Sequence, residues 1–328
     1  MKARRSFTIF VSQVRWAPSL IAALAVVSAL GCGSSATTPA AEIAPSDDAG
    51  GAGQGGVSGS GGEGGAVTTD MGSYDLGAPV TSNGGAAGGS WSCQMLTGIV
   101  RDFRGALPAV GGAPERDGHP DFETFEGRGL TTGLVGPVLG ADRKPVYASH
   151  CEQGVPSQPP CPFGQMTTSA ARFAEWYHNV EGVNLAYYVH LTLESAESGY
   201  STFRSNHFFP LDGAGWGNSG KDENDVPRNF GFTTEIHTTF AYTGGERFTF
   251  TGDDDVWVFI NGRLAIDLGG LHPVEIGTVD LDAVAGTLGI TPGKVYTLDL
   301  FHAERHSIGS NFRVDFNVNL IDCGGVVP

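Results

Sequence analysis

The sequence predicts an all-β fold, an antiparallel β-sandwich with long loops and one short helix. Residues 234–242 and 248–251 alternate apolar and polar side chains on either side of a "TGGE" turn, which is typical of a half-buried hairpin. The pair Asn261-Gly262 separates two apolar runs and is the preferred sequence of a two-residue hairpin turn. Residues 312–320 alternate in the same way. Short strands separated by regular turns indicate a sandwich or a barrel.

The Asn261-Gly262 turn also predicts which side chains of its hairpin share a face. A two-residue loop places Trp257 opposite Ile266, and opposed residues lie on one face. The predicted apolar face consists of Trp257, Phe259, Leu264 and Ile266. The other face is mixed and consists of Val256, Val258, Ile260, Arg263, Ala265 and Asp267. We therefore expect Trp257 in the core and not on the surface as a platform for a sugar ring.

One helix is expected in "SAARFAEWYHNV", where Phe173, Trp176 and Tyr177 recur at helical spacing behind Ser169 as a possible N-cap. Such an aromatic stripe is more typical of packing than of a cofactor site. The Gly- and Pro-rich residues 101–164 are expected to form long loops with few strands.

The N-terminus has the pattern of an export signal. Basic residues precede the apolar run at 20–30, which is shorter than the roughly 20 residues that span a bilayer. We interpret residues 1–31 as a signal peptide. The sequence "ALGC" resembles the lipobox of bacterial lipoproteins, although Leu is commoner where Ala29 stands, and this resemblance implies that Cys32 carries a lipid that anchors it to the outer membrane. The alternative is ordinary secretion.

Composition divides the rest of the chain. Residues 32–90 are rich in Gly, Ser and Ala with few large apolar residues, so we expect a disordered tether. Residues 91–328 are expected to form the folded part. The net charge of −16 argues against a nucleic-acid partner and suits divalent cations and neutral polymers.

The cysteines other than Cys32 predict disulfides. Their even number in an exported chain allows three pairings. We favour Cys151 with Cys161, which closes a Pro-rich loop, and Cys93 with Cys323, which brackets the folded part. Zinc binding is the alternative, but no two of these cysteines have C-x-x-C spacing.

Four motifs resemble the fibro-slime domain family, and the resemblance runs from about Cys93 to Cys323. They are "GHPDFETF" at 118–125, "FFPLDG" at 208–213, "FTFTGDDDVWVFINGRLAIDLGGLH" at 248–272 and "FHAERHSIGSNFRVD" at 301–315. The segment from about 230 to 322 also resembles the protective-antigen (PA14) domain. The resemblance implies a β-sandwich of the protective-antigen type, as in bacterial toxins, glycosidases and fungal flocculins.

The resemblance also implies a calcium site. In lectin members of the wider group, two consecutive aspartates joined by a cis peptide bond hold Ca²⁺, which binds sugar hydroxyls. The matching positions are Asp253 and Asp254, and Asn311 matches a ligand before the final strand. Asp255 could be a third ligand or an acceptor in the turn. Other members lack calcium, and three adjacent aspartates can also form a solvated turn.

Two other chemistries remain open. In "HAERH", His302, Glu304 and His306 lie on one side of an extended strand and, with His272, could bind a transition metal; His302 could equally be a core histidine. Glu304 and one of the aspartates could also serve a glycosidase. The sequence contains no G-x-S-x-G, H-E-x-x-H, P-loop or dinucleotide motif, so we expect no catalysis and no organic cofactor.

These observations predict a cell-surface or outer-membrane lipoprotein whose fibro-slime domain binds carbohydrate through Ca²⁺. The partner would be a carbohydrate or an extracellular polysaccharide, and the role would be adhesion. The alternative is a structural matrix or interaction protein that binds no sugar.

Overall fold

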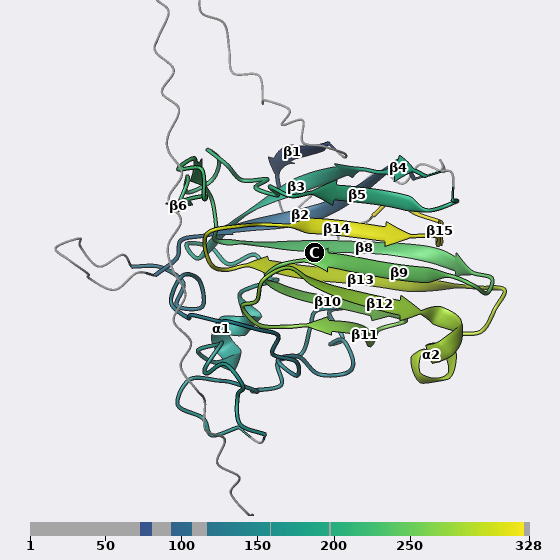
Figure 1. Ribbon diagram of the computed structural model, residues 1–328, viewed down its shortest axis with the longest axis horizontal. Coiled ribbons are helices and arrows are strands. Elements are labelled where there is room, and N and C mark those ends of the chain that lie inside the picture. The colour runs from purple at the N-terminus through teal and green to yellow at the C-terminus, as the bar shows by residue number, and fades with distance from the viewer. Residues whose placement is uncertain (1–72, 81–92, 107–116, 158, 197, 325–328) are drawn as a thin grey trace, which may run out of the picture. The chain divides into compact units, whose positions relative to one another are not determined.

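The computed structural model describes residues 73–80, 93–106, 117–157, 159–196 and 198–324 (Figure 1). The predicted signal peptide, Cys32 and the tether up to residue 72 lie outside them. Within the described ranges, no helix is long and apolar enough to cross a bilayer.

Antiparallel strands form two main sheets. The larger sheet runs, in spatial order, β1 (Tyr74–Pro79), β3 (Asn184–Thr192), β2 (Met95–Phe103), β8 (Phe232–Tyr242), β13 (Lys294–Glu304), β10 (Asp255–Ile260) and β11 (Arg263–Leu268), and β15 (Asn319–Leu320) also pairs with β8. The smaller sheet runs β12 (Glu275–Asp280), β9 (Arg247–Gly252), β14 (Phe312–Phe316), β5 (Ser201–Ser205) and β4 (Glu194–Ser195). A separate small hairpin joins β6 (Gly220–Lys221) to β7 (Pro227–Arg228).

The two sheets enclose one hydrophobic core. Val100, Ile236 and Val258 of the larger sheet and Phe250 and Val314 of the smaller sheet are buried in it. Alternation along the strands of the smaller sheet places polar side chains on its outer face. The predicted all-β sandwich is therefore confirmed.

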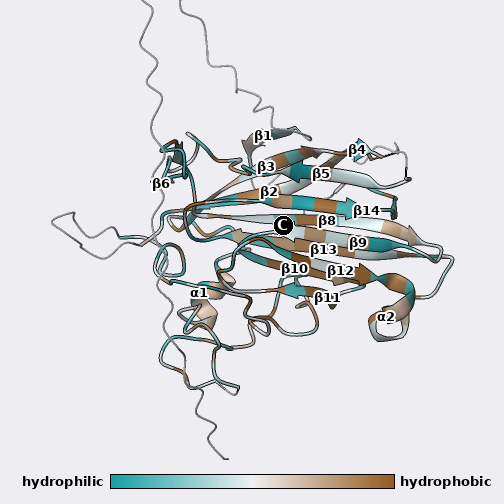
Figure 2. Ribbon diagram, in the orientation of Figure 1, coloured by the Kyte–Doolittle hydropathy of each residue, from teal (hydrophilic) through white to brown (hydrophobic). Residues whose placement is uncertain are grey.

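A second core lies on the other side of the larger sheet. There residues 117–183, which include α1 (Ala170–Ala174), cover the sheet and bury their own aromatic side chains. We call these residues the cover segment. The Trp257 ring lies 5.9 Å from that of Phe173, measured between centroids. Because both faces of β10 are covered, every residue of this strand is buried, and its residues after Asp255 form a continuous apolar run (Figure 2). The core position of Trp257 and the packing role of the aromatic stripe are confirmed.

The predicted register of the hairpin is correct only next to its turn. Phe259 pairs with Leu264 as expected, but a bulge follows, and Trp257 pairs with Asp267 instead of Ile266. The extra residue moves Ile266 to the core between the sheets. Trp257 Nε1 donates a hydrogen bond to Asp267 Oδ1 at 3.0 Å, so the carboxylate satisfies the buried indole.

The described residues contain two helices, one more than predicted. In α1, Ser169 accepts a hydrogen bond from Arg172 N as the predicted N-cap. The second helix, α2 (Leu281–Leu288), has Asp280 as its N-cap and the left-handed Gly289 as its C-cap. These two residues are the usual signals of a helix start and end.

The predicted tether is wrong at its C-terminal end, because β1 forms the edge of the larger sheet by pairing with β3. Tyr74 packs its ring 5.3 Å from that of Phe208, and Leu76 lies against the same core. Two apolar side chains in a Gly-rich region gave too weak a pattern to predict a strand. Both disulfides, Cys93–Cys323 and Cys151–Cys161, are confirmed.

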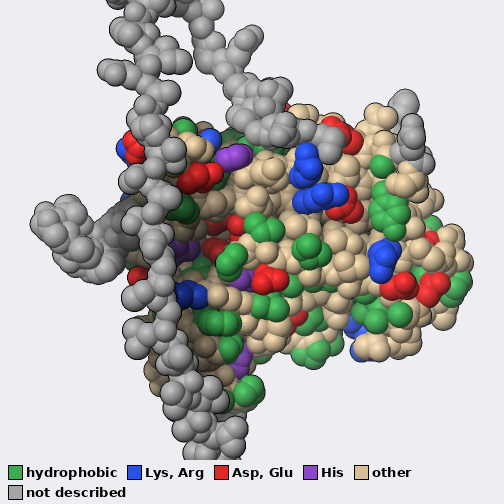
Figure 3. Space-filling view, viewed as in Figure 1, with side chains coloured by type: hydrophobic (Ala, Val, Ile, Leu, Met, Phe, Trp, Pro, Cys, Tyr) green, Lys and Arg blue, Asp and Glu red, His purple; other side chains and the backbone are tan. Residues whose placement is uncertain are grey.

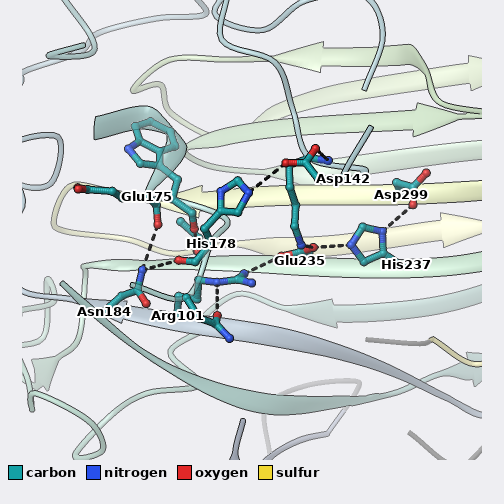
Figure 4. A network of polar contacts seen from close by, with 12 residues as sticks. Arg101, Asp142, Glu175, His178, Asn184, Glu235, His237 and Asp299 are labelled. Carbon is teal, nitrogen blue, oxygen red and sulfur yellow. Dashed lines mark hydrogen bonds and ion pairs between the residues drawn. The ribbon is translucent and has the colours of Figure 1, made fainter. Parts of the chain in front are cut away.

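A buried network of charged groups lies under the cover segment (Figure 4). Glu235 of β8 accepts hydrogen bonds from Arg101 Nη1 at 2.6 Å and from Lys144 Nζ. His237 lies between Glu235 and Asp299 and contacts both carboxylates through its two ring nitrogens. Because carboxylates accept hydrogen bonds, this arrangement favours the protonated imidazole, in which both ring nitrogens donate. The network therefore pairs buried charges and ties the loop at 142–144 to the sheet.

The network predicts a pH dependence of stability. Burial alone would lower the pKa of His237, but its hydrogen bonds to Asp299 and Glu235 raise the pKa above its usual value. Protonated His237 therefore stabilises the folded state. Its contribution to the free energy of unfolding is complete below the unfolded pKa of about 6.5 and is lost as the pH rises through the folded pKa. We expect the urea midpoint of the wild type to fall above about pH 6.5, and to fall less in His237→Gln. Equal slopes in the two proteins would contradict the assignment.

Candidate metal centre

The candidate site lies where the chain crosses twice between the sheets. Asp253 and Asp254 connect β9 of the smaller sheet to β10 of the larger. Residues 305–311 connect β13 back to β14. Phe312 pairs with Gly252, so both crossings lie at the same end of the sandwich. A Cβ at Gly252 would lie 2.2 Å from the Asn311 carbonyl oxygen, and this close approach therefore requires glycine.

Asp253 and Asp254 form the floor of a pocket with a volume of about 370 Å³. The peptide bond between them is cis. They are only 9% and 7% exposed, and burial raises the pKa of both carboxyls. Arg305 N donates to Asp254 Oδ2 at 3.1 Å, which leaves Oδ1 available. His302 Nε2 donates to the Asp253 carbonyl oxygen at 2.9 Å and fixes the backbone of the loop.

Asn311 holds the first aspartate in place. Its backbone N–H donates to Asp253 Oδ1, and its side-chain Nδ2 donates to Asp253 Oδ2 at 2.9 Å. The structure thus brings Asn311 next to Asp253, as the resemblance implies. Because its Nδ2 atom is occupied, its amide oxygen is the atom it can offer to a cation.

Glu304 is a candidate ligand that the sequence did not assign to this site. It ends β13, is fully buried, and neither of its carboxylate oxygens has a hydrogen-bond partner among the described residues. The hydroxyl of Ser310 donates to the Phe208 carbonyl at 2.8 Å. Burial raises the pKa of Glu304, and the charges of Asp254 and Asp253 raise it further. Three carboxyl groups therefore repel one another in a buried place, where a cation would relieve the repulsion.

Asp255 does not belong to the candidate site. It is fully buried and its Oδ1 accepts a hydrogen bond from Gly270 N at 2.6 Å. Its Oδ2 accepts one from Arg305 Nε, also at 2.6 Å. Asp255 thus forms a fully buried ion pair with Arg305 and does not line the pocket, so the structure favours the turn acceptor over the third ligand, the two roles that the sequence left open.

Arg305, which contacts Asp254 and Asp255, also binds the cover segment. Its Nη1 donates to the carbonyl oxygens of Asp121 and Met166 at 3.1 and 2.8 Å, and its guanidinium stacks 4.6 Å above the centre of the Trp176 ring. Asp121 in turn accepts a hydrogen bond from Trp176 Nε1 at 3.0 Å. Through these contacts the cover segment, which contains "GHPDFETF", is joined to Arg305, the residue that follows β13.

The alternative transition-metal site is not formed. His302 is buried with its pKa lowered to about 4 and donates to a backbone carbonyl. The ring nitrogens of His272 contact the carbonyls of Pro273 and Leu268, and His306 contacts that of Ser307. These histidines are bound to the backbone around them, and they do not converge on one point with Glu304.

The spacing between ligand atoms differs between a zinc site and a calcium site. Among the described residues, only His150, Cys151 and Cys161 bring three such ligand atoms within 4.8 Å of one another, and both cysteines are in a disulfide. Zinc ligands lie about 2.0 to 2.3 Å from the metal, so a formed site would fall within that limit. Calcium takes oxygens at about 2.3 to 2.6 Å, so two ligands across the ion lie up to roughly 5 Å apart. Asp253, Asp254 and Glu304 do not bring three ligand atoms within 4.8 Å of one another either, so the preference for Ca²⁺ rests on the oxygen atoms that these residues offer.

The fold is an antiparallel β-sandwich with acidic loops at one end. Residues 192–325 of the chain match the model of the PA14 domain family. The chain is 39% identical over 203 residues to Protein psiD of Dictyostelium discoideum and 37% identical over 207 residues to Protein psiR of the same organism.

These matches cover 61% and 60% of this chain. They cover only 38% and 19% of the relatives, so the chain spans less than two fifths of either. Among solved structures, the PA14 sugar-binding domain from an RTX adhesin is similar with a TM-score of 0.26 and 8% identity. That alignment covers 70% of this chain and 96% of the adhesin domain.

Proposed function

We propose that this protein is a cell-surface lipoprotein whose fibro-slime domain binds carbohydrate through a Ca²⁺ ion, in adhesion or attachment to an extracellular polymer. Asp253, Asp254, Asn311 and Glu304 would hold the ion through oxygen atoms. The ion would supply open coordination positions for sugar hydroxyls. The N-terminal lipid at Cys32 would tether the domain to the outer membrane.

The buried carboxylate of Glu304 carries this proposal. A carboxyl group with no hydrogen-bond partner is costly to bury, and burial together with two neighbouring acids raises the pKa of this one; a bound cation would hold it as the carboxylate. Calcium prefers six to eight oxygen ligands, including carboxylates and amide oxygens. The amide oxygen of Asn311 and the free Oδ1 of Asp254 are of that kind. The solved sugar-binding domain named above and the PA14 match agree with a carbohydrate ligand.

The pocket leaves room for a ligand at the ion. It is lined by the loop 306–309 on one side and by Gly127, Arg128 and residues 271–273 on the other. Ile308 is 57% exposed at its edge, an apolar surface against which the C–H face of a sugar can pack. A hydroxyl pair on a pyranose would reach the cation from the open side.

Calcium is expected to stabilise the protein. At a free concentration about 100 times the dissociation constant, it should add roughly 2.7 kcal/mol to the free energy of unfolding. Thermal unfolding of the full chain, with calcium and with chelator, measures this gain. Asp254→Asn and Glu304→Gln should each reduce it strongly, while Glu194→Gln, an exposed acid on the edge strand β4, should keep it.

The outcome of this experiment separates three functions. A midpoint that calcium leaves unchanged in the wild type would rule out the calcium site. A calcium-dependent midpoint without calcium-dependent hits on a glycan array would favour a structural matrix or interaction protein. A glycosidase would instead turn over a chromogenic glycoside and lose this activity in Glu304→Gln; we propose a binding protein and expect no turnover.

A further inference from the structure

The outer face of the smaller sheet carries side chains in rows that its register defines. Thr251 of β9 pairs with Ile276 of β12 and with Arg313 of β14. Arg313 in turn pairs with Arg204 of β5. The side chains of this first row point outward, because those at the alternate positions of these strands are buried. Two arginines are therefore direct cross-strand neighbours.

Like charges directly opposite each other destabilise an antiparallel pair. Arg313 is partly neutralised by Asp315, whose two oxygens accept hydrogen bonds from its Nε and Nη2 atoms at 2.6 and 2.8 Å. Arg204 makes no hydrogen bond or ion pair with any described residue. Glu194 belongs to the next row, opposite Thr202, and forms no ion pair with Arg204 within the described ranges. Figure 3 looks onto this face and shows basic side chains gathered beside an acidic one over β5 and β14.

This arginine pair adjoins the candidate metal centre. Arg313 follows Asn311 by two residues, and Thr251 precedes Asp253 by two. Two residues of an extended strand span about 6.6 to 6.8 Å, so the backbones of Arg313 and Thr251 lie within that distance of the backbones of Asn311 and Asp253. A saccharide bound at Asp253 and Asp254 can therefore extend over the edge of the sheet toward the two guanidinium groups. Guanidinium groups bind carboxylates and sulfates with paired hydrogen bonds.

We propose that Arg204 and Arg313 form a subsite for an anionic group, a carboxylate or a sulfate, on the saccharide that binds at the calcium centre. The inference rests on the proposed function and narrows its ligand to acidic saccharides. In a chain with a net charge of −16, the guanidinium of Arg204, which has no acidic partner among the described residues, lies beside the Arg313–Asp315 ion pair and supplies the charge complementarity that selects such a ligand.

The test is an array of uronate and sulfated oligosaccharides, each printed beside its carboxyl-reduced or desulfated form and probed with the full chain in calcium. Calcium-dependent hits should fall on the acidic members. Titration calorimetry on the strongest hit should show about tenfold weaker binding in Arg204→Gln/Arg313→Gln, and its neutral counterpart should bind both proteins equally. Arg247→Gln is the matched control, because this arginine lies on the same face opposite Asp280. It should leave the affinity unchanged.

Preference for uronates or for sulfates identifies which anionic group the subsite takes. Equal calcium-dependent binding of acidic and neutral forms by the wild type would overturn the subsite and leave the proposed function intact. So would a double variant that keeps the preference for acidic forms. Absence of any calcium-dependent hit would overturn both.

Discussion

Replacement of Arg305 by methionine is expected to lower the free energy of unfolding by about 3 to 5 kcal/mol. Arg305 is fully buried, and its loss leaves the Asp255 carboxylate without its charged partner in the interior. Two carbonyl groups of the cover segment lose their donor at the same time. Urea unfolding in the presence of chelator measures this cost apart from any effect of calcium.

Arg313→Met is the matched control. Its Nε also donates to an aspartate oxygen at 2.6 Å, but the Arg313 side chain is 43% exposed. Exposed ion pairs contribute roughly 0 to 1 kcal/mol. Comparable losses in the two variants would show that Arg305 does not fasten the cover segment to the strand. Arg305→Met/Asp255→Leu should recover part of the loss, because it removes the unpaired charge as well.

The sequence predicts the parts of the fold that depend on local patterns. The alternation in residues 234–242 and 312–320 and the Asn261-Gly262 turn correctly indicate strands, because one face of each strand meets the core. Ser169 correctly indicates the start of a helix. The bulge in β11 has no local signal, since Ala265 fits either register. The second core depends on packing between segments far apart in the chain, and only the fully apolar "VWVFI" hints that both faces of β10 are covered.

The candidate site also combines residues that the sequence indicates with one that only the structure shows. Asp253, Asp254 and Asn311 are found through the motifs that carry the resemblance. Glu304 has no such signal, because "HAERH" reads equally well as a loop or as a metal motif. Its role depends on being buried without a partner, which only the three-dimensional structure shows. Asp255 is adjacent to the proposed ligands in sequence but pairs with the buried Arg305, a contact that no local pattern indicates.

Removal of the disulfide between Cys93 and Cys323 is expected to cost about 4 to 5 kcal/mol of unfolding free energy. The two cysteines are 230 residues apart, so the bond restricts the unfolded chain over almost the whole folded part. Cys151 and Cys161 are only 10 residues apart, and the same dependence on loop length gives about 3 kcal/mol or less for that bond. Double serine variants of each pair, compared by urea unfolding at one pH, measure both costs.

The larger loss should come from the longer loop, although the short loop carries the more Pro-rich sequence. The Cys323 carbonyl also accepts a hydrogen bond from Thr97 N at 2.8 Å, so the serine variant can keep the end of the chain beside β2 in the native state. The cost then arises mainly in the unfolded ensemble, where a chain without this bond has more conformations available. An equal or greater loss from the Cys151–Cys161 pair would contradict this account and would mean that the cover segment, rather than the closure of the chain ends, limits stability.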